Sequence, residues 1–146
     1  MWLFRTYPSW APIFARLALG VIFFAHGAQK LLGLFGGPGM SKTIQFFAQE
    51  GIPPFLAVVA ILTEFFGGIA LTLGFLTRIA AIGLAIDMVV AIYKVHLQNG
   101  FFLNNSNGPG FEYNLALIGL ALSLLIWGAG NLSIDQVIGG SGDSKR

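Results

Sequence analysis

Two acidic residues lie near the centres of long apolar runs. Glu64 is the only charged residue of 53–73 (PPFLAVVAILTEFFGGIALTL), and Asp87 lies near the middle of 79–95 (IAAIGLAIDMVVAIYKV). Each acid is about 11.5 positions from the middle of the turn between the runs, which is roughly 17 Å at helical rise. An ionisable group at that depth in a bilayer usually faces the bundle interior or a polar cavity. We therefore expect both carboxyls at one depth, turned away from lipid.

Such carboxyls are suited to carrying protons or contacting a ligand. We interpret Glu64 as a proton carrier, the one catalytic role that we assign from the sequence. The alternative is a neutral carboxyl that hydrogen-bonds between packed helices. For Asp87 both interpretations stay open.

Further ionisable side chains lie closer to the ends of the apolar runs. We expect Lys30 and Glu112 to pair, with Lys94 and His96 in the same layer, above a pocket floored by Glu64 and Asp87. For the two lysines the alternative is that each extends to the membrane interface. The candidate ligand-binding residues are therefore His26, Lys30, Glu64, Asp87 and Glu112.

Two arginines are assigned structural roles. Arg16 is interpreted as an interface anchor or a structural partner of Asp87, and Arg78 as a structural charge beside the turn. The two histidines and three carboxylates of the apolar runs are spread over the four segments without metal-ligand spacing, so we predict no metal site.

The composition indicates a membrane protein. The chain has 146 residues, of which 55% are hydrophobic and 10% charged, whereas soluble domains carry about 25% charged residues. We expect one integral membrane domain, residues 1–146, in contact with the lipid bilayer. A net charge of +2 without a basic cluster argues against nucleic acid as a partner. The absence of cysteine excludes disulfides and thiolate chemistry within the chain.

Four apolar segments of about 20 residues predict an all-α, membrane-spanning four-helix bundle. Their expected bounds are 11–32, 53–73, 77–96 and 111–128. Pro53-Pro54 is typical of a helix start and Gly74 of a helix end. An even number of spans puts both termini on one side, and Arg5, Arg78, Lys145 and Arg146 favour the cytoplasm for that side.

The connecting segments are also distinctive. In the first long loop, 33–51, Ser41 is expected to cap a short interfacial helix with Ile44, Phe47 and Ala48 on one face. The second, 98–110, is rich in turn residues and is interpreted as a lid. The polar, glycine-rich tail 128–146 is expected to be frayed or surface-bound.

Small residues share helical faces with the charged ones. Such residues let membrane helices approach closely, so we expect these faces to point toward one another. The faces are Arg16, Gly20, Phe23, Gly27 and Lys30; Ala57, Ala60, Glu64, Gly67, Gly68 and Leu71; Ala80, Gly83, Asp87, Ala91 and Lys94; and Glu112, Ala116, Gly119 and Ser123.

Several motifs in order along nearly the whole chain resemble those of the DoxX family of membrane proteins. They are Arg16-Leu-Ala-Leu-Gly20, His26-Gly27 with Lys30-Leu31, Glu64-Phe-Phe-Gly67-Gly68, Gly74-Phe-Leu-Thr-Arg78, Gly110-Phe-Glu112-Tyr-Asn-Leu115 and Gly128-Ala-Gly130-Asn-Leu-Ser-Ile-Asp135. The resemblance implies a four-helix membrane bundle in a bacterial or archaeal cytoplasmic membrane. It also implies a link to membrane-bound oxidoreductase systems, since the namesake group is associated with thiosulfate:quinone oxidoreductase.

Three functions are compatible with these features. The first is a quinone-interacting subunit of an oxidoreductase system, because an apolar slot with a few polar partners suits a quinone. The sequence shows no flavin, haem or nicotinamide motif, so this hypothesis requires a membrane or peripheral redox protein as partner and no intrinsic cofactor beyond a bound quinone. The alternatives are a structural or assembly subunit of a larger membrane complex and a small proton-coupled transporter.

Overall fold

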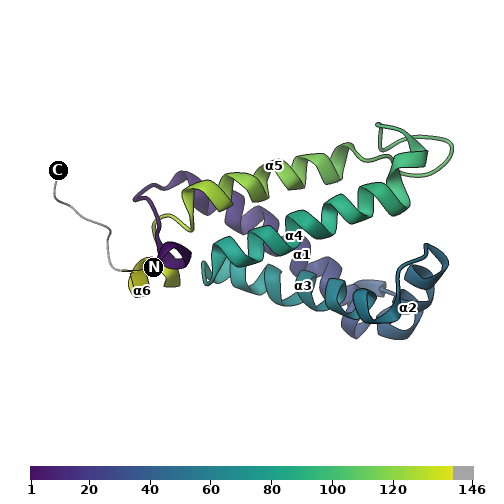
Figure 1. Ribbon diagram of the computed structural model, residues 1–146, viewed down its shortest axis with the longest axis horizontal. Coiled ribbons are helices and arrows are strands. Elements are labelled where there is room, and N and C mark those ends of the chain that lie inside the picture. The colour runs from purple at the N-terminus through teal and green to yellow at the C-terminus, as the bar shows by residue number, and fades with distance from the viewer. Residues whose placement is uncertain (140–146) are drawn as a thin grey trace.

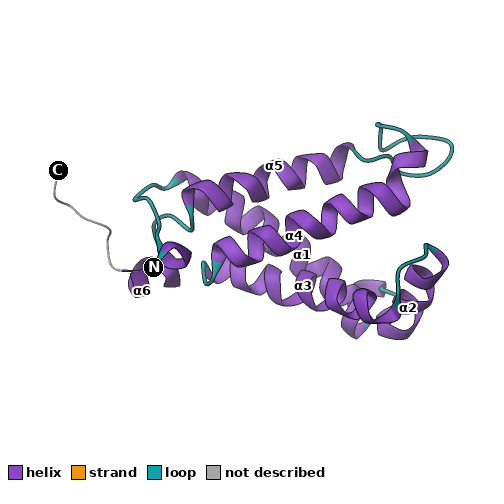
Figure 2. Cartoon of the chain, in the orientation of Figure 1, coloured by secondary structure: helices purple, strands orange, loops and turns teal. Residues whose placement is uncertain are grey.

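The computed structural model describes residues 1–139, and these form helices and loops without a strand. Four long helices, α1 (Ala11–Leu32), α3 (Pro54–Leu73), α4 (Thr77–Ala91) and α5 (Glu112–Trp127), make an up-and-down bundle (Figure 1). Two short helices, α2 (Gly39–Gln49) and α6 (Ile134–Gly139), lie at opposite ends of it (Figure 2). Short turns complete the fold: η1 (Trp2–Phe4), η2 (Leu34–Gly36), the π-helical η3 (Ile92–His96) and η4 (Leu97–Asn99). The predicted all-α bundle is confirmed.

The helices α1 and α3 touch backbone to backbone. A Cβ added to Gly27 would lie 2.4 Å from the Phe65 backbone nitrogen, and one on Gly68 would lie 2.3 Å from that of Phe24. Only glycine fits so close an approach, and membrane helices commonly pack through small residues of this kind. The contact between α3 and α4 is looser: Figure 1 shows the two helices together at their turn and separating toward the loop end. That separation makes room for the cavity described below.

The helix ends follow the local signals. Pro53 precedes the first residue of α3, and Gly74 ends that helix in the left-handed region at φ 65°. The third predicted segment, 77–96, contains two kinds of helix: the α-helix ends at Ala91, and the π-helical turn η3 follows it. The fourth helix has 16 residues, or about 24 Å, and is shorter than the three that are long and apolar enough to cross a membrane.

The predicted helix of the first long loop is present as α2, but its expected cap is wrong. The helix begins at Gly39, after Pro38, and no side chain caps its first turn. Ser41 lies inside the helix and is exposed. The tight turn of η2 lets the helix begin three residues earlier than a cap at Ser41 predicts, because Pro38 takes the N-cap position.

The small-residue face predicted for the fourth helix points the wrong way. Ala116 and Gly119 are exposed, and a Cβ added to Gly119 would meet nothing within 4 Å. The buried residues of α5 are instead Asn114, Leu117, Ala121 and Leu124. This helix is apolar on all sides, so the spacing of apolar and polar residues along it does not predict which face is buried.

The C-terminal segment is docked rather than frayed as far as Gly139; residues 140–146 lie outside the described part of the chain. Asp135 is 1% exposed, and its carboxylate accepts hydrogen bonds from the backbone N–H groups of Leu76 (2.7 Å) and Thr77 (2.9 Å). These amides begin α4 and have no partner within that helix. Asp135 therefore caps α4 from a distant part of the sequence.

We expect Asp135→Ala to lower the free energy of unfolding by about 1–2 kcal/mol, the range for loss of an N-cap. The measurement is equilibrium unfolding in detergent. Val137→Ala is the control, because this side chain on the same helix is exposed. Equal stability of the two variants would contradict the capping role.

The two buried arginines bind backbone carbonyls. Arg16 is 2% exposed and donates to the carbonyls of Leu71 (3.1 Å), Ala129 (2.7 Å), Asn131 (3.3 Å) and Leu132 (2.9 Å). Arg78 donates to those of Leu125, Ile126 and Arg5. Of the two interpretations of Arg16, the pairing with Asp87 is thus wrong, because the chain after α5 folds back and supplies acceptors at the level of the guanidinium.

Candidate functional site

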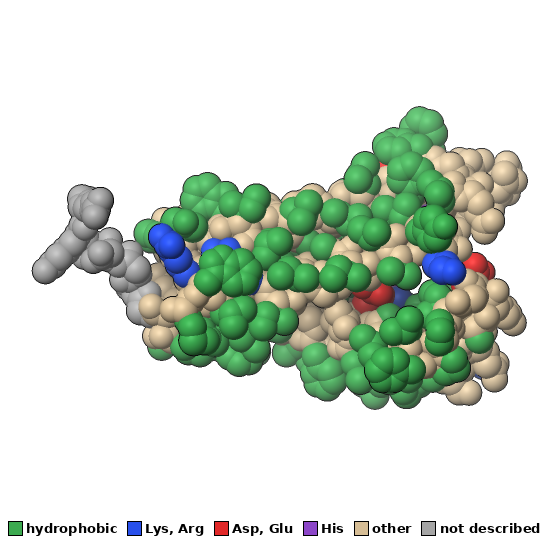
Figure 3. Space-filling view, viewed as in Figure 1, with side chains coloured by type: hydrophobic (Ala, Val, Ile, Leu, Met, Phe, Trp, Pro, Cys, Tyr) green, Lys and Arg blue, Asp and Glu red, His purple; other side chains and the backbone are tan. Residues whose placement is uncertain are grey.

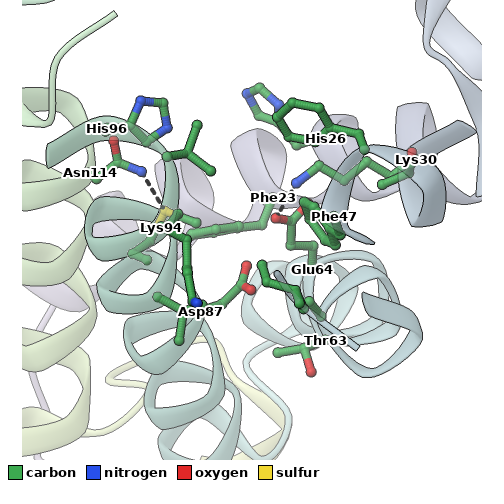
Figure 4. A pocket seen from close by; sticks show the side chains of 18 of the residues that line it. Phe23, His26, Lys30, Phe47, Thr63, Glu64, Asp87, Lys94, His96 and Asn114 are labelled. Carbon is green, nitrogen blue, oxygen red and sulfur yellow. Dashed lines mark hydrogen bonds and ion pairs between the residues drawn. The ribbon is translucent and has the colours of Figure 1, made fainter. Parts of the chain in front are cut away.

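A cavity of about 1080 Å³ lies in the half of the bundle nearer the two long loops. Its walls come from α1, α2, α3, α4, η3 and the first turns of α5, and most of its lining side chains are apolar. Polar side chains that the long helices contribute to this lining include His26, Lys30, Thr63, Glu64, Asp87 and Asn114 (Figure 4).

Among the described residues one ion pair lies in the cavity, and it is not the predicted pair of Lys30 and Glu112. Lys30 Nζ lies 2.5 Å from Glu64 Oε1, with Glu64 2% exposed. The same ammonium lies 5.7 Å from the centroid of the Phe47 ring on α2. Lys30 therefore links α1 to α3 and contacts α2.

The expected pairing of Lys30 with Glu112 is wrong, and Glu112 does not line the cavity. Its carboxylate accepts a hydrogen bond from the backbone N–H of Leu103 (2.8 Å). Glu112 is the first residue of α5, where its charge also suits the helix dipole. The second long loop returns over that helix end and offers its own donor, so the side chain turns outward.

Two carboxylate oxygens in the cavity lack a donor. Glu64 Oε2 and Asp87 Oδ2 are both buried, and neither accepts a hydrogen bond from any residue of the described chain. The two carboxyl groups extend toward the same space from α3 and α4 (Figure 4). Leaving a buried acceptor unsatisfied is costly, and few native groups are left so. The arrangement indicates a site for a hydrogen-bond donor that residues 1–139 do not supply.

The histidines and Lys94 lie around the loop side of the cavity. His26 is exposed and lines the wall. The ring of His96 is held by the second long loop, because its Nδ1 donates to the carbonyl of Pro109 (2.9 Å). Lys94 reaches toward the end of the first long loop, where a Cβ on Gly51 would lie 3.6 Å from its Nζ.

Thr63 and Asn114 are among the site residues that were not singled out from the sequence. Asn114 is buried, lines the cavity, and its Nδ2 lies 3.4 Å from the sulfur of Met88 on α4. An uncharged amide in the first turns of an apolar helix is a weak signal, although polar side chains there often bond across helices.

The π-helical turn η3 places the last polar groups of α4. The regular helix ends at Ala91, and the five residues Ile92–His96 follow the wider winding. Such turns are frequent at functional sites because they shift side chains out of the helical register. Here the shift sets the direction of Lys94 and His96 relative to Asp87, which precedes the turn.

The cavity opens sideways between α3 and α4. Residues that line it there are also well exposed: Leu56 and Val59 of α3 are 50% and 44% accessible, and Ile86 and Val90 of α4 are 59% and 40%. In the space-filling view a hollow separates the two helices, and acidic atoms are visible inside it (Figure 3). The rim of this opening is apolar.

Comparison with known proteins identifies the family. The DoxX family model matches residues 11–97, which span α1 to the end of η3. The chain belongs to the DoxX family. The motifs quoted from the first three apolar segments lie within this match.

Relatives of this DoxX chain include proteins of two bacteria. It is 35% identical over 123 residues to a Bacillus subtilis protein named "Putative oxidoreductase CatD", with 84% of this chain and 83% of the relative covered. It is 33% identical over 124 residues to "Inner membrane protein YqjF" of Escherichia coli, covering 85% and 88%. "Inner membrane protein YphA" of the same bacterium is 31% identical over 130 residues, covering 85% and 87%. No solved structure matches the chain.

Family, relatives and helix lengths agree on the environment. Three helices are long and apolar enough to cross a bilayer, and two of the relatives are named as inner membrane proteins. The protein is a DoxX-family membrane protein, and lipid surrounds its apolar exterior.

Proposed function

We propose that this protein is the quinone-binding membrane subunit of an oxidoreductase system. The observation that carries the proposal is the apolar cavity, open between α3 and α4 at membrane depth, with an acid pair at its inner end. A quinone is a ring with polar oxygens on an apolar tail, and it travels within the hydrocarbon of the bilayer. The opening admits such a molecule without passage through water.

The polar groups are placed for the ring, and the apolar rim for the tail. A pocket of this type fixes its ligand with a few polar contacts among apolar walls. Glu64 and Asp87 lie at the inner end, whereas Leu56, Val59 and Ile86 line the way in.

Interconversion of quinone and hydroquinone moves two electrons and two protons, so the site needs a proton path. Glu64 is suited to hold and release those protons, since one of its oxygens is fixed by Lys30 and the other is free. We assign the electrons to a membrane or peripheral redox protein that docks on this subunit. The name of the Bacillus subtilis relative, which refers to an oxidoreductase, supports a role in redox chemistry.

The first test is the content of the purified protein. Isolated in mild detergent from its membrane, it is expected to carry quinone that organic extraction and mass spectrometry detect. Ala60→Phe, which adds a ring inside the cavity wall, should lower the bound quinone at least about tenfold by occupying its space. Leu62→Phe is the matched control, because Leu62 is an exposed residue of the same helix outside the cavity. Equal quinone content in the two variants would remove the support for this site.

The second test addresses Glu64. Glu64→Gln keeps the size of the side chain and can still accept from Lys30, but it cannot ionise. We expect the variant to remain folded and to lose activity, or binding of the reduced form of the quinone, by about tenfold or more, the value of a charge-assisted hydrogen bond from a hydroxyl group to the carboxylate. Bound quinone and thermal stability are measured on the same sample. Unchanged binding and activity in a stable Glu64→Gln protein would leave this residue a structural role only.

We further propose that the protein lies in the cytoplasmic membrane with both termini in the cytoplasm, because Arg5 and Arg78 flank the terminal face. The chain has no cysteine, so single cysteines report sidedness cleanly. A membrane-impermeant maleimide added to whole cells should label Ser106→Cys in the second long loop and not Ser9→Cys. The reverse pattern would invert the proposed topology.

A further inference from the structure

At the inner end of the cavity, the unpaired polar groups are mainly hydrogen-bond acceptors. Glu64 Oε2 and Asp87 Oδ2 are buried and without a partner among the described residues. Of the neighbouring donors, Lys30 is engaged by Glu64 Oε1 and the Asn114 amide points at the Met88 sulfur. Lys94 Nζ lies at the loop side, against Gly51. A ligand ring seated at the inner end therefore meets oxygens that accept.

This pattern discriminates between the two redox forms of a quinone. The oxidised ring carries carbonyl oxygens, which only accept hydrogen bonds and would face the ion-paired Glu64 carboxylate acceptor to acceptor. The reduced ring carries hydroxyl groups, which donate. A hydrogen bond from a hydroxyl group to a carboxylate is charge-assisted and stronger than one between neutral groups. A mismatch also leaves the buried carboxylate unsatisfied.

We infer that the acid pair of Glu64 and Asp87 binds the hydroxyl groups of a hydroquinone, so that the site prefers the reduced form of its ligand. The inference rests on the proposed function, because it specifies which form of a quinone the same cavity holds. Two oxygens on neighbouring helices, α3 and α4, receive the ring, and the opening between those helices receives the tail. The Lys30 ammonium keeps the Glu64 carboxyl in place for this contact.

The experiment compares three ligands on the full-length protein in lipid nanodiscs under argon. They are a decyl-substituted benzoquinone, its hydroquinone, and the dimethyl ether of that hydroquinone, which has the same ring and tail but no O–H group. Binding is measured by isothermal titration calorimetry. We expect the hydroquinone to bind about tenfold or more tightly than the other two.

The variant Asp87→Asn sharpens the test. Its amide can donate as well as accept, so the ratio of hydroquinone to quinone affinity should fall toward one or below. Glu50→Gln is the matched control, because it makes the same change from acid to amide outside the cavity and should leave the ratio unchanged. The comparison of the three ligands on the unaltered protein stands by itself should Asp87→Asn not fold.

The outcomes separate this inference from the proposed function. Equal affinities for quinone and hydroquinone would overturn the inference while leaving a quinone site. Binding of the dimethyl ether as tight as that of the hydroquinone would also overturn it, because the O–H groups would then be irrelevant. No binding of any of the three ligands would overturn the proposed function, and the inference with it.

Discussion

Lys30→Met is expected to destabilise the protein by about 3 kcal/mol or more, because it leaves the carboxylate of Glu64 buried without its counter-ion. The pair is close, at 2.5 Å, and Glu64 is almost inaccessible, so water cannot replace the ammonium from the bulk. The cost arises from the charge that stays behind. Equilibrium unfolding by SDS titration, with circular dichroism as the signal, measures it.

A double-mutant cycle isolates this coupling. Lys30→Met combined with Glu64→Leu removes both charges, and the double variant is expected to recover most of the loss, since apolar replacement of a buried pair is often neutral. The control cycle combines Lys30→Met with Glu112→Gln. These two residues share no partner in the described structure, so their effects should add within about 0.5 kcal/mol. Coupling between Lys30 and Glu112, with none between Lys30 and Glu64, would contradict the structure and support the pairing predicted from the sequence.

Arg16→Met is expected to cost about 3 kcal/mol or more as well. It removes donors from the carbonyls of Leu71, Ala129, Asn131 and Leu132, and the hydrogen bonds to the first two are buried. Unsatisfied buried acceptors cost about 1–3 kcal/mol each, although some will find other partners. Because three of the four follow α5, the docking of α6 should loosen together with the bundle.

Two measurements check this role of Arg16. Unfolding in detergent gives the loss of stability, and limited proteolysis reports release of the segment after Trp127. Arg16→Lys is the control: it keeps the charge but has three donors on a point-like ammonium rather than a planar fork, so an intermediate loss is expected. An Arg16→Met protein with native stability and an intact C-terminal segment would show that the guanidinium is dispensable.

The helices and their ends were largely predictable because the relevant signals are local. Pro53 before α3 and Gly74 after it act through their own backbone conformations, which do not depend on distant residues. The failures at Ser41 and at the face of α5 have different causes. The serine competed with a turn formed by earlier residues, and α5 is apolar all round, so its rotation was undetermined by its own sequence.

The candidate site was predictable in depth but not in its contacts. Spacing along the helices placed Glu64 and Asp87 in one layer, and both line the same cavity. It also placed Lys30 near Glu112, yet Lys30 binds Glu64 instead. Distance along a helix gives the level of a side chain in the membrane. It does not predict which side chain of another helix lies beside it at that level.

By itself the sequence determined an all-helical membrane chain, the positions of its turns, and two acids in mid-membrane, because hydropathy, chain breaks and helical rise are properties of contiguous residues. Only the tertiary structure decided the partner of each charge. The glycines of α1 and α3 draw those helices together and set Lys30 against Glu64. The return of the chain after α5 gives Arg16 its carbonyls and gives α4 its cap from Asp135. These contacts join residues that are far apart in sequence, and they depend on how whole helices rotate and pack against one another.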